Sequence, residues 1–320
     1  MDRVDLLEIV EPGILASVQD IGRPGYRQIG VAPSGAADSY ACRIGNLLVG
    51  NLESAAVVEI TLMGFQARFR REAVVAVTGA DLGACLNGAP LPLWTASRVG
   101  PGDILAVKAP VCGCRAYLAV GGGISVPAVM GSRATNTGAR FGGLDGRTLA
   151  AGDVLPGTRP EAHLHCTGRS IPAALKPAYT SEWVLRVIPG PQADQFTRGG
   201  RALFYEAVYT VSQKSDRTGV RLDGPALEKQ PGAPDSILSE GIMAGAIQVP
   251  GDGRPIILLN ETVTGGYRKI AVVAAADLPL LGQLAPGDTV RFQEMDIPAA
   301  VGLLRQVEAA VDWVRARWAD

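Results

Sequence analysis

Glycine and proline occur so often in this sequence that long helices can occupy only a small part of it. The 320 residues include 40 glycines and 22 prolines, about a fifth of the chain. Both residues are disfavoured inside helices and favoured in the tight turns that join short strands. Apolar runs of strand length recur at residues 73–78, 104–108, 116–120, 184–188, 256–259, 270–274 and 289–292. The sequence therefore predicts a mainly β fold with many short strands.

Helical periodicity is rare and indicates two helices. In residues 36–49 the apolar side chains fall on one face, and Gly50 is a suitable C-terminal stop. In residues 298–318 an apolar stripe at three-four spacing comprises Leu304, Val307, Val311, Val314 and Trp318. We expect this C-terminal helix to pack on its own domain; the alternative is a helix that binds a partner.

The chain length predicts about two domains. A segment that is rich in proline and contains both histidines, residues 158–180, is expected to link them. We therefore expect a β-barrel-like domain at residues 1–157, a second at residues 181–295 and a helix at residues 296–320. A short Asp/Arg/Gly pattern recurs in both halves, so the two barrels are expected to be related.

Composition excludes several classes of function. Lysine and arginine total 30 and aspartate and glutamate 31, so the chain lacks the basic surplus of a nucleic-acid-binding protein. No uncharged apolar run is long enough to cross a membrane, and the first residues do not resemble a secretory signal. Five cysteines are too few for a disulfide framework. We expect a cytoplasmic protein that binds neither nucleic acid nor membrane.

The common catalytic motifs are missing from the sequence. It contains no phosphate-binding loop of the Gly-x-x-x-x-Gly-Lys type and no Gly-x-Ser-x-Gly elbow. His163 and His165 are the only histidines, and both lie in the expected linker, so no metal site is expected. Catalysis would then depend on carboxylates, arginine, lysine, tyrosine and backbone groups.

Four polar clusters spaced by glycine remain as candidate sites. They are residues 19–26, residues 33–38 at the start of the first expected helix, residues 215–217 and residues 260–269. Paired glycines let a backbone approach a ligand closely, and the amides at a helix start can bind an anion. Each cluster could equally be a salt-bridged turn or a helix cap.

Further motifs follow one another along the chain and include parts of these clusters. They are residues 16–26, 30–38, 46–51, 115–123, 185–192, 215–219, 245–250 and 264–267. Together they resemble the family of 5-oxoprolinase C subunits, also called KipA-like or allophanate hydrolase subunit 2. They are also similar to one half of the carboxyltransferase domain of urea carboxylase. The resemblance covers about residues 8–292 and implies cyclophilin-like β-barrels.

The resemblance implies one component of an ATP-dependent enzyme that cleaves 5-oxo-L-proline to L-glutamate. It implies a B-type (KipI-like) partner and an A-type partner, with ATP and Mg²⁺ as co-substrate and little activity in the isolated chain. One alternative is a carboxyltransferase that acts on urea or a similar amide, with carboxybiotin carried by another protein. Another is a non-enzymatic regulator that binds a KipI-like protein. None of these implies a covalently bound cofactor.

Both enzymatic alternatives require an amide to be held and activated. Cationic donors can stabilise charge on its oxygen, and a carboxylate can accept its N–H. By residue type, the expected catalytic residues are Asp20, Arg23, Asp38, Asp216, Arg217 and Lys269. The expected substrate-binding residues are Gln19, Tyr26, Ser34, Gln248, Glu261, Thr264, Gly265, Gly266 and Tyr267.

The fourth cluster departs from the pattern of the family it resembles. Many members carry an acid where this chain has Asn260 and a proline where it has Arg268. A new carboxylate, Glu261, appears beside the first of these positions. The departures predict either a ligand other than 5-oxoproline or a weakened activity.

Overall fold

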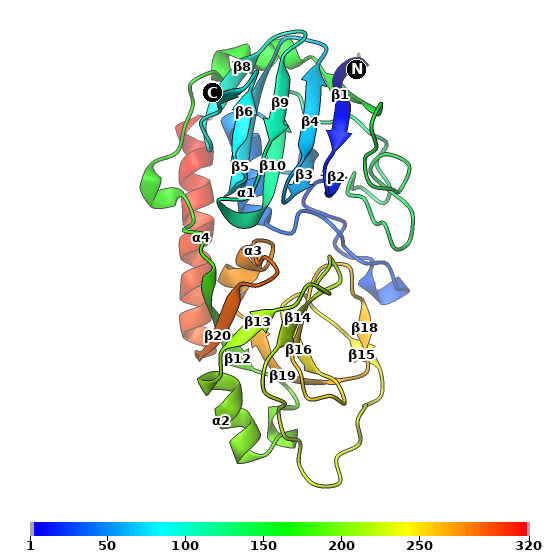
Figure 1. Cartoon of the computed structure of the whole chain (residues 1–320), viewed down its shortest axis with the longest axis vertical. Coiled ribbons are helices and arrows are strands. Elements are labelled where there is room, and N and C mark those ends of the chain that lie inside the picture. Colours follow the sequence, from blue (N-terminus) through cyan, green and yellow to red (C-terminus); the bar gives the residue numbers. More distant parts are fainter. Residues whose placement is uncertain (1–2, 319–320) are drawn as a thin grey trace. The chain divides into compact units, whose positions relative to one another are not determined.

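The computed structural model describes residues 3–318 and is built mainly of β-strands (Figure 1), so the predicted fold class is confirmed. The chain divides into two compact units. The N-terminal unit comprises Met1–Arg23, Ser34–Tyr179 and Ala309–Asp320, and the C-terminal unit comprises Pro24–Pro33 and Thr180–Glu308. Within residues 3–318 no helix is long and apolar enough to span a membrane.

Two sheets form the N-terminal unit. The six-stranded sheet has the order β11 (Val154–Thr158), β1 (Arg3–Pro12), β4 (Phe65–Phe69), β9 (Ile104–Val107), β6 (Ala84–Leu86) and β7 (Ala89–Pro90). The five-stranded sheet has the order β2 (Leu15–Gln19), β3 (Val57–Thr61), β10 (Cys112–Val120), β5 (Ala73–Asp81) and β8 (Ala96–Val99). The strand pairs of these sheets are antiparallel. A tight turn joins β6 to β7, whereas most other pairs join strands that are far apart in the sequence.

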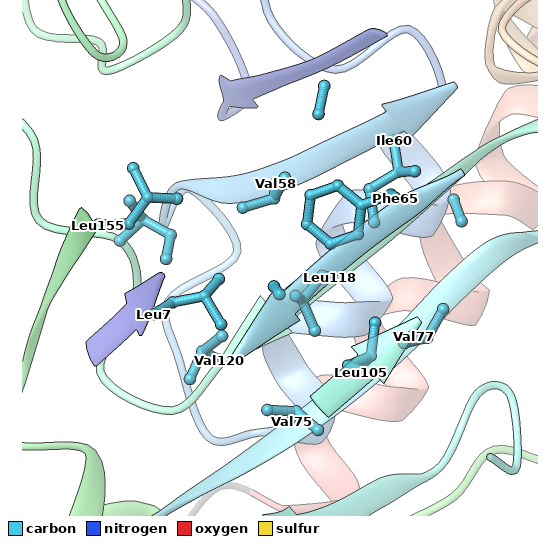
Figure 2. Packing of buried hydrophobic residues seen from close by; sticks show 14 of the residues in the cluster. Leu7, Val58, Ile60, Phe65, Val75, Val77, Leu105, Leu118, Val120 and Leu155 are labelled. Carbon is cyan, nitrogen blue, oxygen red and sulfur yellow. The ribbon is translucent and has the colours of Figure 1, made fainter. Parts of the chain in front are cut away.

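The core of this unit contains apolar side chains from both sheets. In β4, Phe65, Ala67 and Phe69 are fully buried while the residues between them are more exposed, which is the period of two that a strand imposes. Figure 2 shows Phe65 beside Val58 and Leu118, which come from the other sheet. Burial of such side chains contributes about 1.5–3 kcal/mol each, so this cluster is a main source of the unit's stability.

A helix covers the outer face of the five-stranded sheet. α1 (Ser39–Leu48) contacts β5 and β10, which explains why both strands are buried on both faces. Polar side chains on this face fix the helix and its start. The Thr78 hydroxyl donates to the carbonyl of Ala41 at 2.7 Å, and the Tyr117 hydroxyl accepts the N–H of Asp38 at 2.7 Å. The helix expected in residues 36–49 is confirmed.

A closed seven-stranded barrel forms the C-terminal unit. Its order is β12 (Glu182–Pro189), β19 (Arg268–Val273), β16 (Ala246–Val249), β17 (Ile256–Leu258), β14 (Gly219–Asp223), β13 (Tyr209–Val211) and β20 (Thr289–Glu294). Parallel pairing of β20 with β12 closes it, whereas the other pairs are antiparallel. A two-stranded sheet, β15 (Glu240–Gly241) and β18 (Thr264–Gly265), belongs to the same unit (Figure 1).

Alternating side chains fill the barrel. Trp183, Leu185 and Val187 of β12 are buried, with more exposed residues between them. α2 (Arg198–Glu206) packs on β20, where the rings of Phe204 and Phe292 stack at 4.4 Å between centroids. The remaining short elements of this unit are η1 (Arg27–Ile29), η4 (Ala193–Gln195), η5 (Ala275–Asp277) and α3 (Leu278–Leu281).

The expected C-terminal helix is also confirmed. α4 runs over Ile297–Arg317, and Val311 and Val314 of its predicted stripe are fully buried. The expected linker carries structure of its own, namely η2 (Pro160–Cys166) and η3 (Ala173–Leu175), and it is grouped with the N-terminal unit. The main segment of the C-terminal unit begins at Thr180, and the unit also includes Pro24–Pro33, which were expected in the first domain.

One histidine of η2 is held inside the N-terminal unit. His163 Nδ1 lies 2.9 Å from the carbonyl oxygen of Val49, so this nitrogen carries the proton of the hydrogen bond. Burial lowers the pKa of His163 below its ordinary 6.5. The folded protein therefore resists protonation that the unfolded chain accepts.

We expect this histidine to make the protein less stable as the pH falls below 6.5. In that range the unfolded chain binds a proton that the folded imidazole does not, so the free energy of unfolding decreases with decreasing pH, by up to about 1.4 kcal/mol per pH unit. Chemical denaturation of the wild type and His163→Gln between pH 5 and 7 measures the slope. His165→Gln should retain most of the slope, because burial of His163 is its largest cause. Equal slopes for the wild type and His163→Gln would contradict the prediction.

Candidate functional site

The residues predicted as a site are divided between the two units. The N-terminal unit holds Gln19, Asp20, Arg23, Ser34 and Asp38. The C-terminal unit holds Tyr26, Asp216, Arg217, Gln248, Glu261, Thr264, Gly265, Gly266, Tyr267 and Lys269. Each group is therefore described within its own unit.

Asp20 is buried, and its carboxylate accepts hydrogen bonds from the chain itself. Oδ1 accepts the N–H of Gly22 at 2.7 Å and the hydroxyl of Ser132 at 2.6 Å, and Oδ2 accepts the N–H of Arg133 at 2.5 Å. These bonds fix the turn after β2 against a distant loop. Gly35 completes the arrangement, because a Cβ there would lie 2.8 Å from the nitrogen of Gly22 at a φ of +93°.

Arg23 is buried beneath the same distant loop, residues 129–141. Its guanidinium donates to the carbonyl of Ala134 and lies 4.7 Å from the ring centroid of Phe141. Neighbouring residues attach to this loop as well, since Asn136 donates to Ser34 at 3.1 Å and Gln19 donates to the carbonyl of Thr135 at 3.2 Å. This loop carries no motif in the sequence, because its contacts with Gln19, Arg23 and Ser34 join residues that are far apart along the chain.

Asp38 caps α1. One carboxylate oxygen accepts the N–H of Ala41 at 2.9 Å and the other accepts the hydroxyl of Tyr179 at 2.7 Å. Burial and the nearby Asp38 charge raise the pKa of Tyr179 well above its usual value, so this tyrosine stays a donor. Glu59, fully buried on β3, accepts the N–H of Ala37 at 2.9 Å. The carboxylates of this group thus accept hydrogen bonds from the chain's own donors, an arrangement that holds loops and the start of α1 in place. A catalytic role for Asp20, Arg23 and Asp38 stays a prediction.

In the C-terminal unit, Arg217 is held between two loops. Asp216 Oδ1 accepts the N–H of Thr218 at 2.7 Å and of Gly219 at 3.1 Å, which closes a tight turn around the arginine. Arg217 Nη2 lies 3.4 Å from Glu261 Oε1, and only about a tenth of either side chain is exposed (12% and 11%). Glu261, the carboxylate by which the fourth cluster (residues 260–269) departs from the family pattern, therefore lies beside Arg217 of the third cluster.

The rest of the fourth cluster surrounds a lysine. Gln248 lies directly opposite Lys269 on neighbouring strands, and both are buried. Gln248 donates to the carbonyl of Tyr267 at 3.3 Å. A Cβ on Gly265 would lie 2.4 Å from Gln248 Nε2, so any larger residue there would force the Gln248 amide to move. The structure thus brings together Gln248, Gly265, Tyr267 and Lys269. That these residues hold a substrate stays a prediction.

Three functional candidates of this unit were missed by the sequence analysis. Glu240 forms an ion pair with Lys269, and Gln192 donates to Glu240 at 3.0 Å. Arg27 donates from Nη1 to the carbonyls of Ile242 at 2.6 Å and Thr262 at 2.8 Å. Two of them had a sequence signal, because Gln192 ends the motif at residues 185–192 of the resemblance and Arg27 directly follows the motif at residues 16–26.

Arg268, which stands where many family members have a proline, has a structural role. Arg268 is buried, donates to Gln195 Oε1 at 2.6 Å and also donates to the carbonyl of Pro234. It therefore ties β19 to two loops, and a proline there would lack both donors. This explains Arg268 without requiring it to contact a ligand.

Chemically, the C-terminal unit offers the cations Arg217 and Lys269, the carboxylates Glu240 and Glu261, and the amide of Gln248. The side chains of Arg217, Glu261 and Lys269 are nearly buried, whereas that of Glu240 is exposed. Arg217 and Lys269 can contact phosphate, carboxylate or a developing oxyanion, and Gln248 can orient an amide. Within residues 3–318 no group of three histidine, cysteine, aspartate or glutamate side chains is placed to hold a metal ion.

Comparison with protein families gives one match that spans most of the chain. Residues 29–294 match the carboxyltransferase domain, subdomain A and B. The C subunit of 5-oxoprolinase from Escherichia coli is 37% identical over 303 residues, which is 92% of this chain and 93% of that protein.

Larger proteins contain a similar segment. Urea amidolyase of Saccharomyces cerevisiae is 36% identical over 323 residues, covering 95% of this chain but 17% of that protein. The crystal structure of the Kluyveromyces lactis urea carboxylase matches with a TM-score of 0.92 at 35% identity, covering 98% of this chain and 29% of that chain. The chain thus spans less than a third of the urea-metabolising proteins that it matches.

Proposed function

Since the chain belongs to the family of 5-oxoprolinase C subunits and has its carboxyltransferase-type fold, we propose that it acts as the C subunit of an ATP-dependent 5-oxoprolinase. The observation that carries the proposal is its 37% identity over nearly the whole length of both proteins. The proposed reaction opens the lactam of 5-oxo-L-proline to L-glutamate in the cytoplasm. Its partners are a KipI-like B-type protein and an A-type protein, with ATP and Mg²⁺ as co-substrate.

The C-terminal group supports this chemistry. Arg217 and Lys269 would stabilise negative charge that develops on the lactam oxygen or on a transferred phosphoryl group. Gln248 would orient the amide by hydrogen bonds to its oxygen or N–H. Glu261, placed against Arg217, keeps the guanidinium in one orientation before the ligand arrives.

A carboxyltransferase acting on urea or a similar amide is the second candidate. It is favoured by the TM-score of 0.92 with a urea carboxylase structure. The same cations would bind the carboxylate of carboxybiotin, which would be carried by another protein. Dependence of turnover on a biotinylated partner, together with the absence of L-glutamate among the products, would favour this candidate.

We expect the isolated chain to hydrolyse ATP weakly or not at all, with or without 5-oxoproline. The sequence has no self-contained phosphate loop, and the proposed working unit includes other proteins. Mixing the chain with its A-type and B-type partners should raise 5-oxoproline-dependent ADP release well above the sum of the parts. The assay follows ADP and L-glutamate together, with 2-pyrrolidinone as the matched lactam that cannot yield glutamate.

Two results would overturn the proposal. Strong 5-oxoproline-stimulated hydrolysis by the highly purified chain alone would contradict the assignment to a multi-protein enzyme. Absence of L-glutamate from the complete mixture, with all three proteins bound to one another, would contradict the reaction itself.

A further inference from the structure

The ammonium group of Lys269 is buried, but its counter-ion comes from the surface. Only 8% of the lysine side chain is exposed, compared with 43% of the side chain of Glu240. The hydrogen bond from Lys269 lowers the pKa of Glu240, so this carboxylate is charged at neutral pH. Gln192 connects the two residues, because its amide donates to Glu240 at 3.0 Å while its oxygen accepts the N–H of Lys269 at 3.1 Å.

Glu240 lies on a segment that is attached to the barrel mainly by polar contacts. We call residues 234–241 the flap. The flap is held by an ion pair between Lys229 and Asp235, by Arg268 at the carbonyl of Pro234 and by the N–H of Ile237, which donates to Gly266 at 2.8 Å. Its last two residues form β15, which pairs with β18. Of its two large apolar residues, Ile237 is partly buried and Leu238 is 92% exposed.

Because these contacts are few and mainly polar, we expect the flap to separate from the barrel at a small cost in free energy. An element with few buried apolar contacts opens locally with a small free energy. The lysine cannot move in the same way, because β19 is a strand of the closed barrel with neighbours on both sides. The ion pair therefore joins a fixed cation to an anion that can withdraw.

A buried ammonium requires an anion beside it, because an unpaired charge in such a place is costly. We propose that Glu240 occupies a carboxylate subsite at Lys269, and that the carboxylate of the substrate replaces it there. The subsite is completed by the Gln192 amide, which already donates to the carboxylate of Glu240. Gln248 and the Gly265 backbone lie beside it and would face the amide of the same molecule.

This inference rests on the proposed function and narrows its substrate class to small amides that carry a carboxylate. 5-Oxo-L-proline has both groups, whereas urea has no carboxylate. The ligand must compete with Glu240, an intramolecular carboxylate held at high effective concentration. Removing the negative charge of Glu240 should therefore strengthen carboxylate binding, which is the opposite of what loss of a direct ligand contact would do.

The test uses the full chain without ATP or partners, so that it is independent of turnover. Acetate, 5-oxo-L-proline and 2-pyrrolidinone are titrated into the wild type and Glu240→Gln, with binding followed by calorimetry and by the ¹⁵N resonance of the Lys269 ammonium. Glu72→Gln is the matched control, because Glu72 forms a surface ion pair with Arg98 in the other unit. Lys269→Met removes the cation itself.

We expect Glu240→Gln to bind acetate and 5-oxo-L-proline about tenfold more tightly than the wild type or Glu72→Gln, and to shift the Lys269 resonance on binding. 2-Pyrrolidinone should show no such gain, and Lys269→Met should bind neither carboxylate. Unchanged or weaker carboxylate binding by Glu240→Gln, with unchanged melting temperature, would overturn the inference.

The probes separate this inference from the proposed function. Tighter acetate binding without tighter 5-oxo-L-proline binding supports the carboxylate subsite and counts against 5-oxoproline as the substrate. Normal 5-oxoproline turnover by the assembled enzyme, combined with carboxylate affinities that do not respond to Glu240→Gln, supports the proposed function and overturns the subsite.

Discussion

Replacement of Arg217 by alanine is expected to lower kcat/KM of the assembled enzyme by about 10²–10³-fold, the usual cost of removing one donor that stabilises transition-state charge. The structure supports this expectation in two ways. The turn closed by Asp216 fixes the backbone on both sides of the arginine. The guanidinium also lies in a setting of low exposure, where its charge acts strongly on a neighbouring ligand.

The main alternative is that Arg217 only stabilises the fold through Glu261. Glu261→Gln distinguishes the two roles, because it weakens the ion pair and leaves the arginine in place. If Arg217 acts on the ligand, Glu261→Gln should lose less than about tenfold in kcat/KM, well short of the loss in Arg217→Ala. Arg254→Ala, at an exposed ion pair with Asp223, is the control and should retain full activity.

Steady-state kinetics with 5-oxo-L-proline and thermal unfolding of each variant would decide between these roles. Equal losses of activity in Arg217→Ala and Glu261→Gln, accompanied by equal losses of melting temperature, would assign Arg217 a structural role. Full activity in Arg217→Ala would remove this residue from the mechanism.

The fold was largely predictable because its signals are local. Strand periodicity needs only the side chains of one segment, and the expected strand at residues 184–188 lies within β12. α2 was missed because it contains two adjacent glycines, which ordinarily disfavour a helix. Tertiary packing explains one of them, since a Cβ on Gly200 would lie 2.5 Å from the carbonyl oxygen of Glu228.

The candidate site was predictable in its residue types but not in their partners. The sequence shows that Asp20 and Asp38 are carboxylates beside glycine-rich turns. It does not show that Ser132, 112 residues away, donates to the first, or that Tyr179, 141 residues away, donates to the second. Such pairs are set by the closure of sheets and loops, which no local pattern records.

The same reasoning explains why Lys269 was found and Glu240 was not. A lysine after a glycine-rich stretch stands out in sequence, whereas an acid within a polar loop is ordinary. Only the pairing of β15 with β18 places Glu240 opposite Gly265 and brings its carboxylate to the lysine.

The largest loss of stability is expected from Asp277→Ala. Asp277 is fully buried, and its carboxylate accepts hydrogen bonds from three donor groups of Arg186 within the C-terminal unit. Oδ2 accepts the backbone N–H of Arg186 at 2.8 Å and its Nε at 2.9 Å, while Oδ1 accepts from Nη2. Hydrogen bonding to Asp277 raises the pKa of Arg186. Without Asp277 the arginine still remains charged, because a guanidinium is not deprotonated in proteins.

Breaking a buried ion pair by removing one partner typically costs about 3–5 kcal/mol. The side chain of Arg186 is 32% exposed, so water can solvate part of the orphaned charge and the lower limit, about 3 kcal/mol, applies here. At about 2–4 °C per kcal/mol for a domain of this size class, the melting temperature of the C-terminal unit should fall by roughly 6–12 °C.

Asp277→Asn separates the charge from the hydrogen bond. Its amide oxygen can still accept the backbone N–H of Arg186, so we expect a smaller loss than in Asp277→Ala, because only the ionic part is removed. Calorimetry or a fluorescence melt of both variants measures the difference. Equal melting temperatures for the wild type and Asp277→Ala would show that the ion pair contributes no net free energy to folding. Apolar packing alone would then hold β12 against η5.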